Sequence, residues 1–191
     1  MSEHIKEKET LDALTNTFDK VHGNVQREKR VIVETEAETV PGVLLYAKES
    51  LNYNHFSHMS CVDWIEDKQF ELVYILWSPE DKIQLTIKCR IDREEPVMQN
   101  IDNIWRQANT YEREIREMYG VEFEGLVGAK EFILEDWEDM PPMRKDFDTK
   151  EYVDDHFFDR PGREDAKDVR TEITERSGEK IPDFAKKYSR D

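Results

Sequence analysis

The sequence has few of the residue patterns that bind a redox centre, a nucleotide or a metal ion. Its two cysteines, Cys61 and Cys89, form no CxxC pair, so the thiols of this chain do not make an iron–sulfur or zinc site. The seven glycines form neither GxGxxG nor GxxxxGK[ST], and no serine lies in a nucleophile-elbow sequence. We therefore expect no cofactor in this chain and two reduced, buried thiols.

Long apolar runs and excess positive charge are also absent. No stretch approaches the roughly 18 apolar residues that a membrane span needs, and the first ten residues contain no apolar signal-peptide core. The formal net charge of -16 disfavours nucleic acid and anionic membrane surfaces as partners. These features predict a soluble, cytoplasmic protein that meets a membrane only through a partner.

The spacing of apolar residues predicts a small α+β domain. Leu11, Leu14 and Phe18 recur at helical spacing, and Gly23 is placed where a helix can end in a left-handed residue. Alternation of apolar and polar residues predicts a β-hairpin on either side of the turn-forming residues 78–82. The expected elements are helices over 10–21, 40–51 and 101–119 and strands over 31–33, 55–65, 70–77 and 83–91.

The hairpin indicates how the sheet is packed. On its second arm every other residue from Ile83 to Ile91 is apolar, which is typical of a strand with one buried face and one wet face. We expect a mostly antiparallel sheet with helices on one face. Asn100 is a candidate N-cap and Gly120 a candidate stop for the last helix.

The last part of the chain differs from the rest. Residues 1–148 can form the α+β domain, whereas residues 149–191 contain many charges and few aliphatic side chains and cannot build a core of their own. The tail is either disordered or an extended segment that wraps over partner subunits. Its candidate anchors are the isolated aromatic residues Tyr152, Phe157, Phe158, Phe184 and Tyr188.

His55 and His58 are the sharpest candidate for metal chemistry. An HxxH pair places two imidazoles together on a helix, but this segment has a strand pattern. Residues three apart on a regular strand face opposite sides, so we expect no metal site here.

Two polar runs remain to be explained. In the first, Glu112 and Arg116 would be one helical turn apart, as would Arg113 and Glu117, which is typical of an ordinary charged helix surface. In the second, Pro141 and Pro142 extend the backbone before the bases at 144–145, as in a docking segment or a rigid exit from the domain.

These runs carry a resemblance to a known family. Residues 108–114, 118–125 and 143–147 resemble, in order and at compatible spacing, three motifs of the 30 kDa subunit of complex I (NADH:quinone oxidoreductase). Residues 61–64, Cys-Val-Asp-Trp, resemble a fourth motif upstream. The resemblance covers residues 55–148, and it includes the related subunits of membrane-bound [NiFe] hydrogenases and ferredoxin-linked complexes.

The resemblance implies a structural role without an active site. The chain would lie in the peripheral, cytoplasmic arm of an ion-translocating oxidoreductase, beside subunits related to the hydrogenase large and small subunits, of which the latter carries iron–sulfur clusters. The alternative is a stand-alone binding or regulatory module. By resemblance, the residues of the partner interface are Glu112, Arg113, Glu114, Arg144, Lys145, Asp146 and Phe147.

One segment departs from the family. Residues 126–134 lack the His-Pro pair and the arginines that usually follow the second motif. This leaves open an NADH:quinone-type, a membrane-bound hydrogenase or a ferredoxin-driven sulfur-reducing complex.

Overall fold

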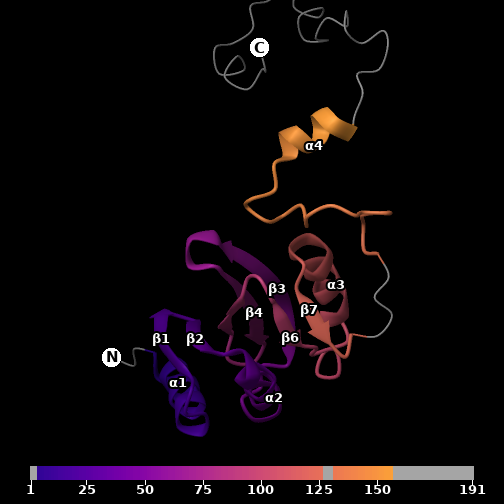
Figure 1. The fold of residues 1–191 in the computed structure, drawn as a ribbon. Helices are drawn as coiled ribbons and strands as arrows, with labels where there is room; N and C mark the ends of the chain where they lie inside the picture. The colour runs from indigo at the N-terminus through magenta and orange to yellow at the C-terminus, as the bar shows by residue number, and fades with distance from the viewer. Residues whose placement is uncertain (1–3, 127–130, 157–191) are drawn as a thin grey trace, which may run out of the picture. The chain divides into compact units, whose positions relative to one another are not determined.

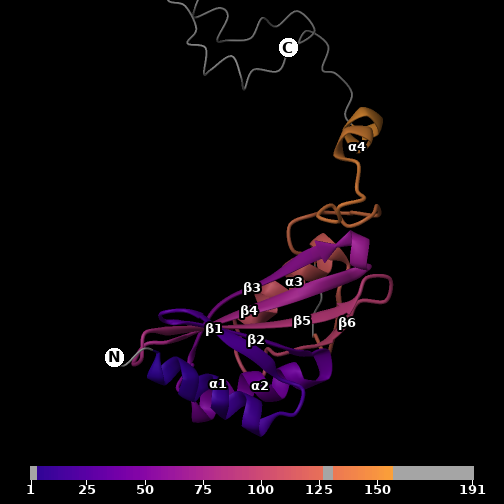
Figure 2. The same cartoon turned by 90° about the vertical axis from the view of Figure 1, so that its left-hand side faces the viewer.

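The computed structural model describes residues 4–126 and 131–156. The chain divides after Phe147 into a first unit and a second that begins at Asp148. Within the first unit a five-stranded sheet carries helices on one face (Figures 1 and 2). This confirms the predicted α+β class.

The sheet is mixed. Its strand order is β1-β2-β5-β4-β3, and every neighbouring pair is antiparallel except β2 and β5, which run parallel. The expected hairpin is confirmed as the β4–β5 pair. The strands are β1 (His22–Arg27), β2 (Arg30–Glu36), β3 (His55–Trp64), β4 (Gln69–Ser78) and β5 (Ile83–Asp92), and β6 (Val97–Gln99) and β7 (Glu122–Glu124) form a separate parallel pair.

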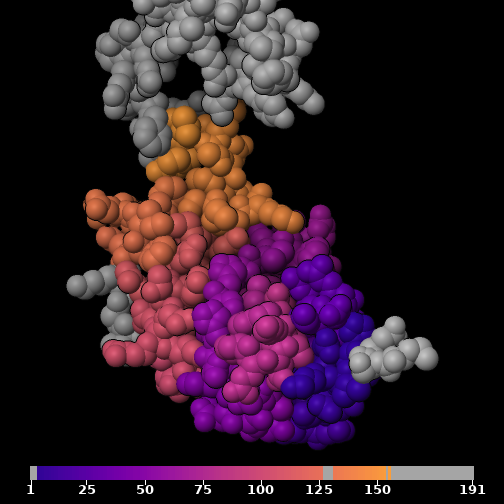
Figure 3. All heavy atoms as spheres, turned by 180° about the vertical axis from the view of Figure 1, so that it is seen from behind, coloured from indigo at the N-terminus to yellow at the C-terminus, as the bar shows by residue number. Residues whose placement is uncertain are grey.

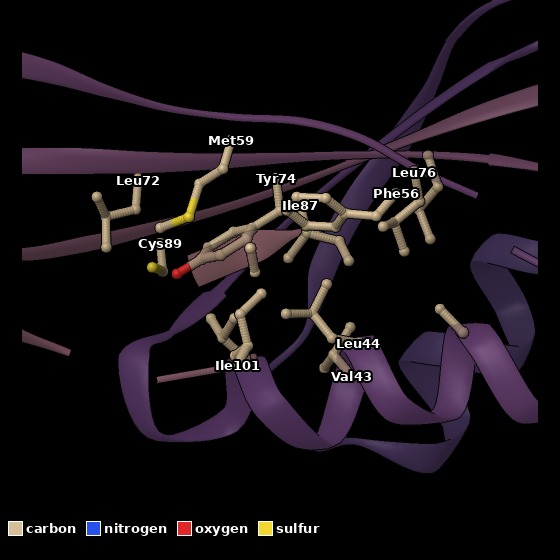
Figure 4. Packing of buried hydrophobic residues seen from close by; sticks show 14 of the residues in the cluster. Val43, Leu44, Phe56, Met59, Leu72, Tyr74, Leu76, Ile87, Cys89 and Ile101 are labelled. Carbon is tan, nitrogen blue, oxygen red and sulfur yellow. The ribbon is translucent and has the colours of Figure 1, made fainter. Parts of the chain in front are cut away.

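The helices cover the face of the sheet that the alternation predicted. The helices of the first unit are α1 (Ile5–Thr17), α2 (Val40–Ser50) and α3 (Ala108–Tyr119), with short 3-10 turns at Ala37–Thr39 and Ile65–Asp67. Figure 4 shows Val43 and Leu44 of α2 pointing at Tyr74 and Ile87 of the sheet. All four side chains are fully buried. Burial of this apolar layer is the main stabilising contribution to the fold.

Two helix predictions are wrong in extent. The first helix begins at Ile5 and ends at Thr17, because Phe18 is already extended, and Gly23 lies in β1 rather than at a helix end. A Cβ at Gly23 would lie 2.3 Å from the carbonyl oxygen of Ile32, so the close approach of β1 to β2 requires glycine. The last helix begins at Ala108, not at Ile101, since residues 101–107 form turns.

Helix α3 protects an edge of the sheet. Strand β3 is an edge strand, and side chains just before and within the first turn of α3 donate hydrogen bonds to backbone carbonyls in and beside it. Gln107 donates to Phe56, and the Tyr111 hydroxyl donates to Ser57 at 3.4 Å. Such bonds satisfy groups that would otherwise be open to another strand.

The two histidines of β3 face the same side, contrary to the expectation. The pairing of β3 with β4 shifts by one residue between Phe56 and His58, so His55 lies opposite Trp77 and His58 opposite Ile75. This β-bulge adds one residue and returns His58 to the face of His55. Within residues 4–126 and 131–156, no group of three or more His, Cys, Asp or Glu is arranged to hold a metal ion.

The second unit is described only at its start. Residues Thr149–His156 form helix α4, so this part of the expected extended tail is helical. Tyr152 lies in α4 and is half-buried, whereas the predicted anchors Phe157, Phe158, Phe184 and Tyr188 lie outside the described residues. The wrapping of the tail around partners therefore stays a prediction.

Candidate functional site

Three of the four motifs that carry the family resemblance, residues 61–64, 118–125 and 143–147, meet at one place in the fold. A buried ion pair lies at its centre: Arg93 Nε donates to Asp63 Oδ1 at 2.8 Å and its terminal nitrogen to Oδ2 at 3.0 Å. Asp63 comes from the end of β3, and Arg93 follows β5. Both residues are about 95% buried. A paired geometry of this kind is the strong form of an arginine–carboxylate contact.

The third motif closes over this pair. We call residues 141–147 the clasp segment. The backbone N–H of Lys145 donates to Asp63 Oδ2 at 2.9 Å, and Arg93 donates to Asp146 Oδ1 at 2.6 Å. The clasp segment is thus held by the carboxylate of one strand and the guanidinium that follows another.

The pKa values of the two carboxyl groups report the same contacts. Burial alone would raise the pKa of Asp63, but the bonds from Arg93 and from the Lys145 N–H outweigh it and hold that pKa below its ordinary value. The hydrogen bond from Arg93 also lowers the pKa of Asp146. Both groups are therefore charged at neutral pH, and their negative charges face the same arginine.

Arg144 fixes the clasp segment to the end of α3. Its Nε donates to the carbonyl of Tyr119 at 2.8 Å, and a terminal nitrogen donates to the carbonyl of Arg93 at 3.3 Å. Arg144 and Arg93 also lie over the ring of Phe70, 5.2 and 5.6 Å from its centre. Such cation–π contacts stabilise a partly desolvated cation.

Gly120 makes room for the clasp segment. It ends α3 with φ of 80°, as the sequence predicted, and a Cβ there would lie 3.1 Å from Pro141 Cγ and 3.4 Å from a terminal nitrogen of Arg144. Glycine adopts this backbone conformation without steric cost. The same residue therefore stops the helix and lets residues 141–144 pass close to its end.

We predict that Gly120→Ala lowers the free energy of unfolding by about 2 kcal/mol, from the left-handed backbone and the contact with Pro141. Gly125→Ala is the matched control, because Gly125 has φ of 86° but no atom of the described residues lies within 4 Å of the added Cβ. Urea unfolding of both variants separates the two causes. Equal losses of unfolding free energy in the two variants would show that Pro141 moves away from the added methyl group at no cost in stability.

Helix α3 organises a second segment through Glu117. Its carboxylate accepts hydrogen bonds from the backbone N–H groups of Phe132, Ile133 (2.8 Å) and Leu134 (2.9 Å). Arg113, one turn earlier, donates to the carbonyl of Glu131 at 2.7 Å. Burial raises the pKa of Glu117, but the three N–H bonds, with the charge of Arg113, outweigh it and leave that pKa lowered.

Glu112 lies inside the molecule. It is fully buried, and it accepts hydrogen bonds from the backbone N–H of Ile101 at 2.8 Å and from the side chain of Asn100. The expected contact with Arg116 is wrong, since Arg116 pairs instead with Glu122 at 3.3 Å. Asn100 does not cap α3 either; its oxygen accepts from the Asp102 N–H and closes a turn.

The residues expected at a partner interface thus have different surroundings. Arg144 and Asp146 make contacts inside the chain, and the buried Glu112 offers no surface of its own. Lys145 is exposed, with its amine 5.9 Å from the ring centre of Trp64. The ring of Phe147 packs against that of Trp137, with the two ring centres 5.8 Å apart. Of the other two, Glu114 is exposed and Arg113 is half-buried.

Three central residues of this site had no assigned role in the sequence. Asp63 stands in the Cys61–Trp64 motif, so the motif itself was the available signal. Arg93 and Phe70 belong to no motif, and only the three-dimensional approach of β3, β4 and the clasp segment reveals them. The two cysteines are free and buried as predicted, and burial raises both thiol pKa values, that of Cys89 to about 12.

Comparison with known proteins gives a consistent answer. The family described as respiratory-chain NADH dehydrogenase, 30 Kd subunit, matches residues 33–153, a range that includes Asp63, Arg93 and the clasp segment. One subunit of the F(420)H(2) dehydrogenase of Methanosarcina mazei is 29% identical over 145 residues, covering 72% of this chain and 89% of that protein. One subunit of the NADH-quinone oxidoreductase of Moorella thermoacetica is 33% identical over 125 residues, covering 63% and 84%.

Solved structures agree. A chain of the membrane-bound sulfane sulfur reductase, an archaeal respiratory membrane complex, superposes with a TM-score of 0.66 at 29% identity, covering 82% of this chain and 97% of its own. The Nqo5 fragment of residues 1–134 gives 0.55 at 20% identity, covering 64% and 98%, and supports the fold alone. In the part of the chain described, no helix is long and apolar enough to cross a membrane. The resemblance seen in the motifs is confirmed: this chain belongs to the family of the 30 kDa subunit of the respiratory-chain NADH dehydrogenase.

Proposed function

We propose that this chain is a non-catalytic structural subunit of the peripheral, cytoplasmic arm of a complex-I-like, ion-translocating oxidoreductase. Its partners would be the subunits related to the hydrogenase large subunit and to the cluster-bearing small subunit. The observation that carries the proposal is the structural use of two motif carboxylates: Asp63 and Asp146 both bind Arg93, and Asp63 also accepts a hydrogen bond from the backbone N–H of Lys145, so that together they fix a segment.

The relatives support a role that does not depend on the substrate. By name, they serve an F(420)H(2) dehydrogenase, an NADH-quinone oxidoreductase and a sulfane sulfur reductase, complexes whose named substrates differ. A subunit that recurs while the substrate changes is suited to holding the geometry of the others. The complex served by this chain would be of the NADH:quinone, membrane-bound hydrogenase or ferredoxin-driven sulfur-reducing type, and its electron donor would be a property of the partners.

The test is purification of the native complex through a tag on this chain. We expect stoichiometric recovery of cluster-bearing subunits with the tagged chain, and no flavin or metal absorption in the isolated chain. A tagged chain that elutes alone, or that carries a cofactor by itself, would contradict the proposal and favour the stand-alone module or an enzyme.

Arg144→Glu is expected to reduce recovery of the complex on native gels, about tenfold, because it reverses the charge that holds the clasp segment. Arg27→Glu, on the exposed strand β1, is the matched control and leaves recovery unchanged. Since Arg144→Glu can also unfold the chain locally, Lys145→Glu is tested beside it, because the Lys145 side chain is exposed. Normal recovery of both variants would show that Arg144 and Lys145 are not needed at the interface.

A further inference from the structure

Three large apolar side chains point outward from one irregular segment of the first unit. Ile133, Met140 and Met143 are 66%, 43% and 55% exposed, although residues 131–143 contain no helix or strand. Single exposed apolar residues are ordinary on a protein surface. Here three of them fall within eleven consecutive residues, so the segment itself needs an explanation.

The backbone of this segment is held in place. The N–H of Ile133 donates to Glu117 at 2.8 Å, and the N–H of Met143 donates to the carbonyl of Met118 at 3.0 Å. Two neighbouring residues of α3 thus bind both ends of the segment. In the middle, Trp137 Nε1 donates to the carbonyl of Met140 at 3.1 Å. In Figure 3 the atoms of this segment, coloured orange, lie at the surface beside the salmon-coloured atoms of the region that contains α3.

This anchoring has an energetic consequence. A loop that orders only on binding loses conformational entropy at that moment, whereas a loop already ordered within its own chain does not. Glu117 and Arg113 therefore preset the position from which Ile133 projects, and the carbonyl of Met118 presets that of Met143. Exposed methionines suit such a surface, because their unbranched side chains adapt to the shape of a partner.

The charge of the segment indicates the chemistry of its partner. Residues 131–143 contain five carboxylates and no basic residue. All five are exposed: Glu131, Glu135, Asp136, Glu138 and Asp139. Apolar side chains within a charged rim are the usual anatomy of a protein interface, and the complementary surface is an apolar groove bordered by Lys and Arg. The same charge repels anionic lipid and nucleic acid.

We propose that residues 131–143, here called the acidic segment, are a docking surface for a partner subunit that presents an apolar groove rimmed by Lys and Arg. Ile133, Met140 and Met143 enter the groove, and the carboxylates meet its rim. The inference rests on the proposed function, because it requires a partner subunit. It adds residues 131–140 as a contact surface and shares residues 141–143 with the clasp segment.

The test uses the tagged full chain in its native complex. The photo-reactive residue benzoylphenylalanine replaces Ile133 or Met143, and in the matched control it replaces Leu45, which is 49% exposed on α2. After irradiation, we expect both test positions to cross-link to one and the same subunit, at a peptide that contains Lys or Arg. Position 45 gives no cross-link to that subunit.

Charge variants test the rim. Glu135→Lys combined with Glu138→Lys is expected to reduce the cross-link from position 133 about tenfold. The control, Glu28→Lys with Glu49→Lys, makes the same change of net charge at exposed sites on other elements and leaves the cross-link intact.

The outcomes separate this inference from the proposed function. If the chain purifies with the complex but positions 133 and 143 give no protein cross-link, the acidic segment is not a docking surface. A cross-link to lipid, or to a surface without basic residues, overturns it as well. If no complex purifies with the chain at all, the proposed function fails. The inference about the acidic segment then fails too, because it requires a partner subunit.

Discussion

Arg93→Ala is expected to lower the free energy of unfolding by about 3 to 5 kcal/mol, since removal of one member of a buried ion pair leaves the other without compensation. In this chain the residue left behind is Asp63, which is 4% exposed and has Arg93 as its paired cation. The same substitution removes the bond to Asp146, so the clasp segment also loses one of its attachments. Urea unfolding of the full chain followed by circular dichroism measures the loss.

Two further variants are needed to interpret the effect of Arg93→Ala: a control at an exposed ion pair and a double variant that removes both members of the buried pair. Arg90→Ala breaks an exposed pair with Asp67 and a 3.8 Å contact with Glu71, which keeps its bond to Lys88, and it should cost less than about 1 kcal/mol, as exposed pairs do. The double variant Asp63→Ala with Arg93→Ala should be less destabilised than the sum of the single variants, because no unpaired charge remains. A loss for Arg93→Ala no larger than that for Arg90→Ala would mean that solvent or another cation reaches Asp63.

Glu112 is expected to make the stability of the chain fall between about pH 4.5 and pH 7. Burial, together with the charge of Asp102, raises the pKa of Glu112 to about 7 from an ordinary value of 4.5, against the effect of the bonds from Ile101 and Asn100. Between these values the folded chain binds more protons than the unfolded chain, so a rise in pH favours unfolding. Over the full window this contributes about 3 kcal/mol, and above pH 7 the effect is constant.

Glu112→Gln tests this directly, because glutamine has no proton to lose. The free energy of unfolding is measured at pH 5, 6, 7 and 8, and we expect wild type to lose about 2.5 kcal/mol relative to Glu112→Gln across the series, since part of the window lies below pH 5. Glu114→Gln, at the exposed neighbouring position, should keep the wild-type profile. Parallel profiles for wild type and Glu112→Gln would show that the buried carboxyl group keeps one protonation state. Asp63, Asp146 and Glu117 have lowered pKa values and act at more acidic pH.

The positions of the motif residues also refine the idea of an interface. The clasp contacts of Arg144 and Asp146 lie within the chain, so their first effect is to position a segment. In the proposed complex, a partner then meets what this segment exposes, including Met143 and Lys145. Motifs shared with the family are thus consistent with an internal fastening that presents a partner surface.

The sequence alone was sufficient wherever the signal was local. The period of two from Ile83 to Ile91 predicted a strand with one buried face, and the structure has it. The apolar spacing of residues 40–51 predicted α2, and Gly120 predicted the end of α3 with a positive φ. Each of these signals depends on a backbone preference or on burial of one face, which a few neighbouring residues determine.

The tertiary structure decided what depends on distant residues. The parallel pairing of β2 with β5 joins segments about fifty residues apart, and nothing near Val33 predicts Ile87 as its neighbour. The bulge after Phe56 places His55 and His58 on the same face of β3, whereas the sequence pattern predicted opposite faces. The periodicity of residues 101–119 predicted one long helix, but Glu112 and Asn100 bind the backbone of residues 101 and 102 in turns instead.

The functional site shows the same division. The sequence determined that this chain carries the motifs of the 30 kDa subunit family, because a motif is a local arrangement of residue types. Only the tertiary structure decided that Asp63, Arg93 and Asp146 meet, since they are brought together by β3, the end of β5 and the clasp segment. Charges pair across such distances along the chain because burial makes an unpaired charge costly, and the fold determines which charges are buried together.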